Sequence, residues 1–236
     1  TRRSFASILN QAKAASLMSQ ALRGIKTKSK KTGASAARRR MSPEERRAQL
    51  LACAIEVFAT RGIRRAGHGD VAKVAGCAVS TVFLYFPTRE ELVDAVLDEI
   101  EAFYASIART VHSDEIDAQA VLLAHSRQFR ESIDSHPEHA LVLLNWAANV
   151  RSRVWPRYME MMESSVRTHR RTIERGIAEG TIDDGVDAES AARVIIGYAN
   201  MSIQLRLAEF EDDRADQVSR RMINALLSPT LNETAA

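Results

Sequence analysis

The chain is poor in aromatic residues and in long hydrophobic runs. Phe, Trp and Tyr make up 6% of its 236 residues, and the alternation of β-branched and polar residues that marks strands is missing. Because Ala, Leu, Arg and Glu are plentiful instead, the composition favours helices. No apolar run approaches the ~18 residues that a membrane span needs, so we expect no membrane-spanning helix.

Cysteine is also scarce. Cys53 and Cys77 lie too far apart in the sequence for a Cys-x-x-Cys motif, so we expect neither a disulfide framework nor a zinc site. Each thiol is more readily interpreted as a small buried hydrophobe than as a redox sensor. Cysteines of this kind suit a reducing compartment, which predicts a cytoplasmic protein.

Acidic residues are absent from residues 1–40, which contain eleven Lys and Arg. This segment carries a charge of +11, which leaves −8 on residues 41–236 within the net charge of +3. A basic segment on an acidic body indicates a polyanionic partner, either nucleic acid or a membrane surface. We favour a disordered basic arm over residues 1–41. A mitochondrial transit peptide, which is also acid-free and contains Arg and Ser, and a misassigned translation start are the alternatives.

Strong helical periodicity begins at Ser42. Ser42 and Glu45 have the spacing of a capping box around Pro43, and apolar residues then recur at helical spacing until Gly62 ends the helix. A second cap at Thr88 opens a long helix, and further helices are predicted at roughly 115–134, 137–150, 156–179, 187–209 and 213–227. The predicted fold is all-α, with an N-terminal three-helix domain (42–88), a C-terminal helical bundle (89–228) and a short tail (229–236).

The two short predicted helices between these caps have the spacing of a helix-turn-helix unit. Residues 70–75 form the supporting helix, residues 76–78 the turn and residues 79–86 the recognition helix, which in such units enters the major groove of DNA. We expect an inward face made of Val79, Val82, Phe83 and Phe86. The expected DNA-contacting residues of the unit are Lys73, Ser80, Thr81, Leu84 and Tyr85.

Several positions in and before this unit have alternative interpretations. Lys73 could equally face solvent, and Tyr85 could belong to the core because it lies among aromatic residues. His68 has no partner at metal-ligand spacing and is interpreted as a turn or capping residue. Arg38, Arg39 and Arg40 precede the first helix and are interpreted as an arm for the minor groove or for phosphates, the alternative being a solvated charge run.

Residues 55–62 (IEVFATRG), 70–72 (DVA) and 81–92 (TVFLYFPTREEL) resemble the signature of the TetR family of transcription regulators. Within that family, the chain is most similar to the LuxR/HapR-type quorum-sensing master regulators. That resemblance is carried by the arginines at 38 and 40, the GHGD run at 67–70 and the tryptophans at 146 and 155. The resemblance implies a homodimer on a pseudo-palindromic operator, arginines in the minor groove and a ligand pocket in the C-terminal bundle.

The sequence departs from the family pattern at two positions. Ala78 stands where a serine usually caps the recognition helix, which leaves one N-terminal amide without its usual acceptor. Leu84 stands where an asparagine usually lies between two aromatic residues, so base preferences cannot simply be carried over from the family.

The predicted bundle contains candidates for two further surfaces. An apolar chamber for a small hydrophobic ligand is expected from Phe129, Leu143, Leu144, Trp146, Trp155 and Met162, although both tryptophans could simply be core. A dimer interface is expected from Val166, Ile173, Ile177, Val194, Ile195, Tyr198 and Met201.

No pattern of residues indicates catalysis. The sequence has no nucleophile–base pair, no glycine-rich phosphate loop and no HExxH motif, so we expect no enzyme, no catalytic residue, no metal and no cofactor. The prediction is therefore a DNA-binding regulator with double-stranded DNA as its partner. An architectural, largely sequence-independent DNA-binding protein and a carrier or sensor of a small apolar molecule are the alternatives.

Overall fold

The computed structural model describes residues 41–111, 116–208 and 212–228, and every regular element in these ranges is an α-helix. The chain divides into two compact units, Thr1–Arg46 and Arg47–Ala236. In the described part of the first unit, the predicted capping box is present. The Glu45 amide donates to Ser42 Oγ at 3.1 Å, and the Ser42 amide donates to Glu45 Oε2 at 2.8 Å.

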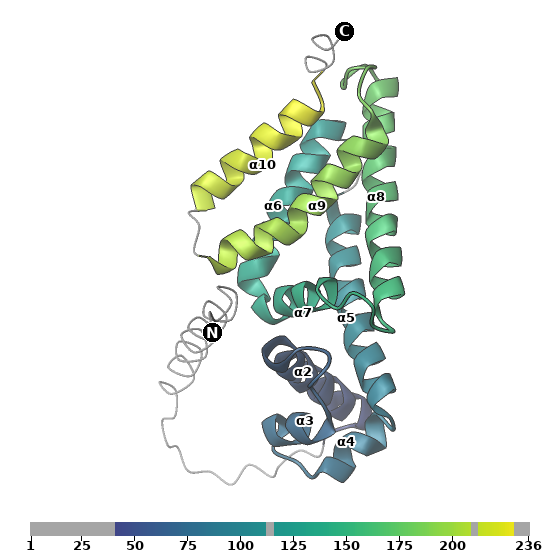
Figure 1. Cartoon of the computed structure of the whole chain (residues 1–236), viewed down its shortest axis with the longest axis vertical. Helices are drawn as coiled ribbons and strands as arrows, with labels where there is room; N and C mark the ends of the chain where they lie inside the picture. Colours follow the sequence, from purple (N-terminus) through teal and green to yellow (C-terminus); the bar gives the residue numbers. More distant parts are fainter. Residues whose placement is uncertain (1–40, 112–115, 209–211, 229–236) are drawn as a thin grey trace, which may run out of the picture. The chain divides into compact units, whose positions relative to one another are not determined.

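The helices agree with those expected from periodicity to within a few residues at each end. They are α2 (Pro43–Arg61), α3 (His68–Ala75), α4 (Val79–Tyr85), α5 (Arg89–Val111), α6 (Ala118–Ser135), α7 (Pro137–Ala147), α8 (Trp155–Ala178), α9 (Ala188–Leu207) and α10 (Asp212–Leu226) (Figure 1).

A first hydrophobic cluster joins α2, α3, α4, the first half of α5 and α7. Leu50, Phe58, Val82 and Leu92 are fully buried in it. Within α2, Leu50, Ala54 and Phe58 share the inward face because they recur every four residues. Full burial of one such side chain contributes about 1.5–3 kcal/mol. The short helices α3 and α4 therefore owe their stability to this shared core rather than to their own length.

A second cluster holds the bundle together through α6, α8, α9 and α10. Leu122, Ile173 and Ile223 are fully buried there. Gly176 lets α8 approach α6 and the loop after α8 closely, since a Cβ on Gly176 would lie 2.7 Å from Ala118 Cβ and 2.6 Å from Ile182 Cδ1.

Two sets of ion pairs define the direction of α5 relative to α8. Asp94 of α5 pairs with Arg153, two residues before α8 begins, at 3.2 Å, and one turn further along α5 Asp98 pairs with Arg157 of α8 at 2.6 Å. The two helices thus run in the same direction, as Figure 1 shows, whereas α6 runs back beside α8. The main cavity described below is lined mainly by residues of these three helices.

The close approach at Gly176 generates a stability prediction. Gly176→Ala should lower the free energy of unfolding by about 1–3 kcal/mol, because the added methyl group overpacks the contact of α8 with α6. Gly69→Ala is the matched control: no atom lies within 4 Å of the added Cβ, and a helical alanine should leave the stability unchanged or raise it slightly. Chemical denaturation of the full chain measures both variants, and equal midpoints for the two would contradict the packing described here.

Candidate nucleic-acid interface and ligand chamber

The turn between α3 and α4 has the backbone geometry of a helix-turn-helix. Gly76 ends α3 in the left-handed conformation at φ 63°, and the Cys77 amide donates to the Ala72 carbonyl at 3.0 Å. Ala78 is the N-cap of α4 and offers no side-chain hydrogen bond, as its residue type requires. The supporting helix begins at His68, two residues earlier than expected.

The inward face of α4 is narrower than predicted. Val82 and Phe86 are buried, but Val79 and Phe83 are 43% and 47% exposed, so assigning them to the inward face was wrong. A helix of seven residues buries only a narrow stripe. Phe83 instead stacks on the His68 ring, with 4.0 Å between centroids and 7° between planes.

His68 ties the beginning of α3 to the end of α4. Its Nε2–H donates to the Phe86 carbonyl at 2.7 Å, since a carbonyl can only accept, and the ring is buried. The Arg47 guanidinium lies 5.2 Å from the centroid of the Phe86 ring. His68 is interpreted from the sequence as a turn or capping residue. In the structure, its hydrogen bond to Phe86 fixes the angle between α3 and α4.

The residues predicted to contact DNA follow the outer side of this pair of helices. Leu84 is 76% exposed, and Ser80 and Lys73 are also exposed. Thr81 and Tyr85 are half-buried, and Tyr85 packs partly against the first cluster, so the core interpretation holds for part of its side chain, and its contact with DNA stays a prediction. Arg38, Arg39 and Arg40 lie outside the described residues.

The two cysteines, Cys53 and Cys77, are free and partly buried, and both pack against the first cluster. Burial, followed by the neighbouring Glu56 and Cys77, raises the pKa of Cys53 above its ordinary value. A raised pKa keeps this thiol protonated and unreactive, in keeping with its interpretation as a small hydrophobe.

A cavity of about 810 Å³ lies between α5, α6, α7, α8 and α9. Phe129, Leu143 and Met162 line it, as predicted for the ligand chamber. Leu144, Trp146 and Trp155 do not line it, so their assignment to the chamber is corrected. Sequence spacing shows that a residue is apolar and on a helix, but not which of two interior surfaces it reaches.

Both tryptophans shape the connection between α7 and α8 instead. Trp146 is fully buried and donates its indole N–H to the Val154 carbonyl at 2.8 Å. Trp155 stacks on Tyr158 with ring centroids 5.2 Å apart. The interpretation of the tryptophans as core residues holds for Trp146, and the aromatic cluster positions the first turn of α8.

Sequence reasoning missed the polar half of the chamber lining. These residues are Glu101, Tyr104, Arg109, His125, Arg157, Glu160, Ser164, Ser165, Thr168, His169 and Asn200. The available signal was the recurrence of Glu101, Tyr104, Ala105, Ala108 and Arg109 on one face of α5. That face has polar side chains at both ends and two alanines in the middle. A search for large apolar side chains does not detect such a face.

Two ion pairs close the chamber at its Arg157 end. The Arg157 guanidinium donates to both Glu101 oxygens, at 2.8 and 2.7 Å, and to Asp98 at 2.6 Å. The hydrogen bonds to Glu101 raise the pKa of Arg157, with a smaller contribution from Asp98. The same guanidinium lies 5.8 Å from the ring centroid of Trp146, so it has three partners: Glu101, Asp98 and the indole ring.

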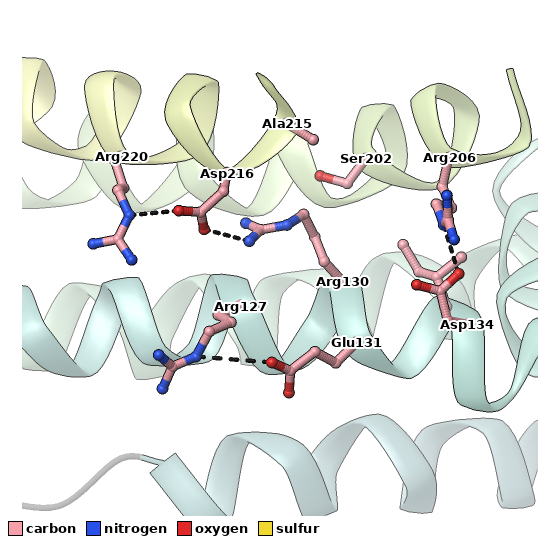
Figure 2. Close-up of a pocket in the computed structure, with 10 residues that line it drawn as sticks. Arg127, Arg130, Glu131, Asp134, Ser202, Arg206, Ala215, Asp216 and Arg220 are labelled. Atoms are coloured by element: carbon pink, nitrogen blue, oxygen red, sulfur yellow. Dashed lines mark hydrogen bonds and ion pairs between the residues drawn. The ribbon is translucent and has the colours of Figure 1, made fainter. Parts of the chain in front are cut away.

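A second cavity, of about 320 Å³, lies between α6, α9 and α10 (Figure 2). Asp216 of α10 accepts hydrogen bonds from Arg130 of α6 and from Arg220, and the bond to Arg220 contributes most to the lowered pKa of Asp216. Arg206 likewise pairs with Asp134 at 2.5 Å. Because these guanidinium groups bind carboxylates of the chain itself, the cavity is a salt-bridged seam that docks α10 rather than a ligand chamber.

Most of the residues predicted for the dimer interface are buried within the single chain, and their assignment to the interface is therefore corrected. Val166, Ile173, Ile195 and Tyr198 are at most 6% exposed and belong to the interior of the single chain, so they have no surface left for a second subunit. Ile177 is half-buried against the second cluster. Val194 and Met201 remain available, at 47% and 45% exposure.

The described ranges contain no group of three or more His, Cys, Asp or Glu side chains placed to hold a metal ion. In the same part of the chain, no helix combines the length and the apolar character that crossing a bilayer requires.

A helix-turn-helix unit with an exposed recognition helix, joined to a helical bundle that contains a cavity, defines the class of ligand-responsive transcription regulators. The profile of bacterial regulatory proteins of the tetR family matches residues 50–96. The chain is 31% identical over 183 residues to the HTH-type transcriptional regulator LuxR of Vibrio harveyi, covering 77% of this chain and 89% of that protein. The chain belongs to the TetR family of transcriptional regulators.

Other relatives and solved structures share the fold. The transcriptional repressor KstR2 of Rhodococcus jostii is 24% identical over 164 residues, which cover 67% of this chain and 78% of that protein. FadR of Bacillus subtilis, solved with stearoyl-CoA, superposes with a TM-score of 0.64 at 19% identity, covering 78% of this chain and 98% of that one. A cysteine mutant of CifR on operator DNA superposes with a TM-score of 0.67 at 20% identity, covering 76% and 95%.

Proposed function

We propose that this protein is a sequence-specific DNA-binding transcription regulator of the quorum-sensing LuxR type, acting in the cytoplasm as a homodimer on a pseudo-palindromic operator. The observation that carries the proposal is the outer face of α4. Leu84 and Ser80 are exposed on a short helix whose inner side is fixed by Val82 and by the hydrogen bond from His68 to Phe86. A rigidly held, outward-facing short helix is what major-groove reading requires.

We assign the parts of the chain as the sequence predicts. Residues 42–88 read DNA, residues 89–228 form the dimerisation and ligand-binding part, and residues 1–41 and 229–236 are an arm and a tail. The arginines at 38–40 bind the minor groove or phosphates, and Lys73, Thr81 and Tyr85 contact the duplex backbone or base edges. The chamber between α5 and α8 holds a small, largely apolar ligand, and no catalytic role is assigned.

The function is tested by DNA selection at two salt concentrations. A regulator should enrich a two-fold symmetric sequence from a random pool and bind it at least about a thousandfold more tightly than random duplex. The affinity for random duplex should fall steeply with salt, because it rests on phosphate contacts. An architectural DNA-binding protein would enrich no sequence, and that outcome would reject the proposal.

Leu84 should govern the preference at one symmetric pair of operator positions. Leucine offers only apolar contact, best suited to a thymine methyl group, whereas asparagine can bond adenine through two hydrogen bonds. Leu84→Asn should therefore sharpen the preference there by about 1–3 kcal/mol and leave the affinity for random duplex unchanged. Parallel selections on the two proteins measure this effect, with Leu84→Ala as the control that removes the side chain without adding a polar group. Identical base preferences in all three proteins would mean that residue 84 does not contact bases.

The homodimer is proposed to form through the exposed side of α9. Val194, Gly197 and Met201 recur there at helical spacing, and a Cβ on Gly197 would meet no atom of its own chain. A small residue between two exposed apolar side chains allows close approach of a second copy of the helix. Two-fold symmetry of the protein would then match the symmetry of the operator.

Charge placed on this side of α9 should therefore separate the subunits. Val194→Glu with Met201→Glu is expected to give a monomer by sedimentation and to weaken operator binding at least tenfold, because one reading head is lost. Val150→Glu is the control, since Val150 is 58% exposed but lies outside α9. A dimer that survives the double substitution would place the interface elsewhere.

A further inference from the structure

The chamber is elongated, and its two ends can be located from bonds between helices. Arg157 of α8 marks one end through its bonds to Glu101 of α5. The hydrogen bond between His169 of α8 and His125 of α6, 2.9 Å long, marks the other end. At 1.5 Å per residue, the lining residues of α8 from Arg157 to Thr168 span about 16 Å. We call this space the α5–α8 slot.

Apolar side chains of five helices line the middle of the slot, beside the polar groups of Tyr104, Ser165 and Asn200. Small side chains of α5, Ala105 and Ala108, face a wall of larger ones from α6, α7, α8 and α9. The larger apolar residues of that wall are Phe129, Leu143, Met161, Met162 and Ile196. An elongated hydrocarbon body fits such a lining, because burying apolar surface there requires no hydrogen bond.

The two ends differ in charge. The carboxylates among the described lining residues are Glu101 and Glu160, both in the half of the slot near Arg157. Arg157 is committed to Glu101 and Asp98, so that end carries no unmatched positive charge. An anionic group would be repelled there by Glu160.

The opposite end carries a cation, and no carboxylate of a described residue lines that end. Arg109, in the last turn of α5, makes no ion pair with any described residue. His125, His169 and Thr168 line the same end. An arginine free of ion pairs at the mouth of an apolar slot is a ready donor for a carboxylate.

The two histidines at this end have a fixed order of protons. His169 Nδ1–H donates to the Ser165 carbonyl at 2.9 Å, because a carbonyl can only accept. In the neutral pair, His169 Nε2 therefore accepts from His125 Nδ1–H. A carboxylate at this end of the slot can accept a charge-assisted hydrogen bond from the guanidinium of Arg109, which lines the slot together with His125.

We propose that the α5–α8 slot binds an elongated apolar carboxylic acid, with its head group at Arg109 and His125 and its hydrocarbon body along Phe129, Leu143 and Met162. That this acid regulates DNA binding rests on the proposed function, whereas its binding to the slot does not depend on that function. The chemistry of the slot excludes the reverse orientation, because the Arg157 end offers carboxylates rather than a free cation.

The test is calorimetric titration of the full chain, without DNA, with dodecanoic acid and its methyl ester below their aggregation limits. The acid should bind about tenfold more tightly than the ester, since only the acid forms charge-assisted hydrogen bonds. Arg109→Gln should remove most of this preference while leaving the ester unaffected. Glu160→Gln, which changes a charge at the opposite end of the slot, should keep the preference.

A third variant tests the location of the hydrocarbon body. Ala108→Phe narrows the middle of the slot and should weaken the acid and the ester alike, whereas thermal denaturation reports whether the variant is folded. Equal affinity for acid and ester, a preference that survives Arg109→Gln, or no binding of octanoic, dodecanoic or hexadecanoic acid would each overturn the proposal.

Repeating the DNA-binding assay with dodecanoic acid separates this inference from the proposed function. Binding of the acid without any change in operator affinity would count against ligand control of DNA binding and leave the slot assignment in place. Sequence-specific DNA binding by a chain that binds none of the acids would leave the regulator function in place and remove the assignment of the ligand.

Discussion

Helix α5 takes part in two packings that cannot be adjusted separately. Its first half places Leu92, Val93 and Val96 in the cluster that also holds Phe58 of α2 and Val82 of α4. Its second half, from Glu101 onward, lines the slot. Because interiors are packed at crystal-like density, a sideways shift of α5 at the slot has to displace the core that holds α4. Both the exposure of Leu84 and the width of the slot depend on this helix.

The connection from α5 to the DNA-reading helices is short and hydrogen-bonded. Arg89, the first residue of α5, donates to the Ile63 carbonyl at 2.5 Å and so binds the turn that follows α2. His68 then binds α3 to the end of α4 through Phe86. Both hydrogen bonds are directional, so they transmit a displacement of α5 to α3 and α4. A ligand that binds more tightly when α5 is displaced would therefore also displace the DNA-reading helices.

The slot persists because α5 and α8 are joined by charges at one end rather than by apolar contact along their length. The Arg157 guanidinium is large, half-buried and bound on three sides by Glu101, Asp98 and the Trp146 ring, so it acts as a spacer. Between α6 and α10, by contrast, ion pairs hold the two helices together rather than apart. Asp216 draws α10 onto α6 through Arg130, and the small cavity that remains there is lined by groups already paired.

Local signals in the sequence specify the helices, their order and the helix-turn-helix unit, because caps, glycine stops and periodicity act over a few residues. Ser42 with Glu45, Gly76 and Pro87 were enough to place the reading unit, and the motif around Leu84 was enough to indicate the family. Tertiary structure alone decided which apolar stripe of each helix faces which neighbour. Ile173 and Trp146 became core, Val194 and Phe83 stayed exposed, and Arg109 and His125 came to line the same slot. These outcomes depend on contacts between residues far apart in the chain, and helical periodicity carries no information about which helix will lie opposite.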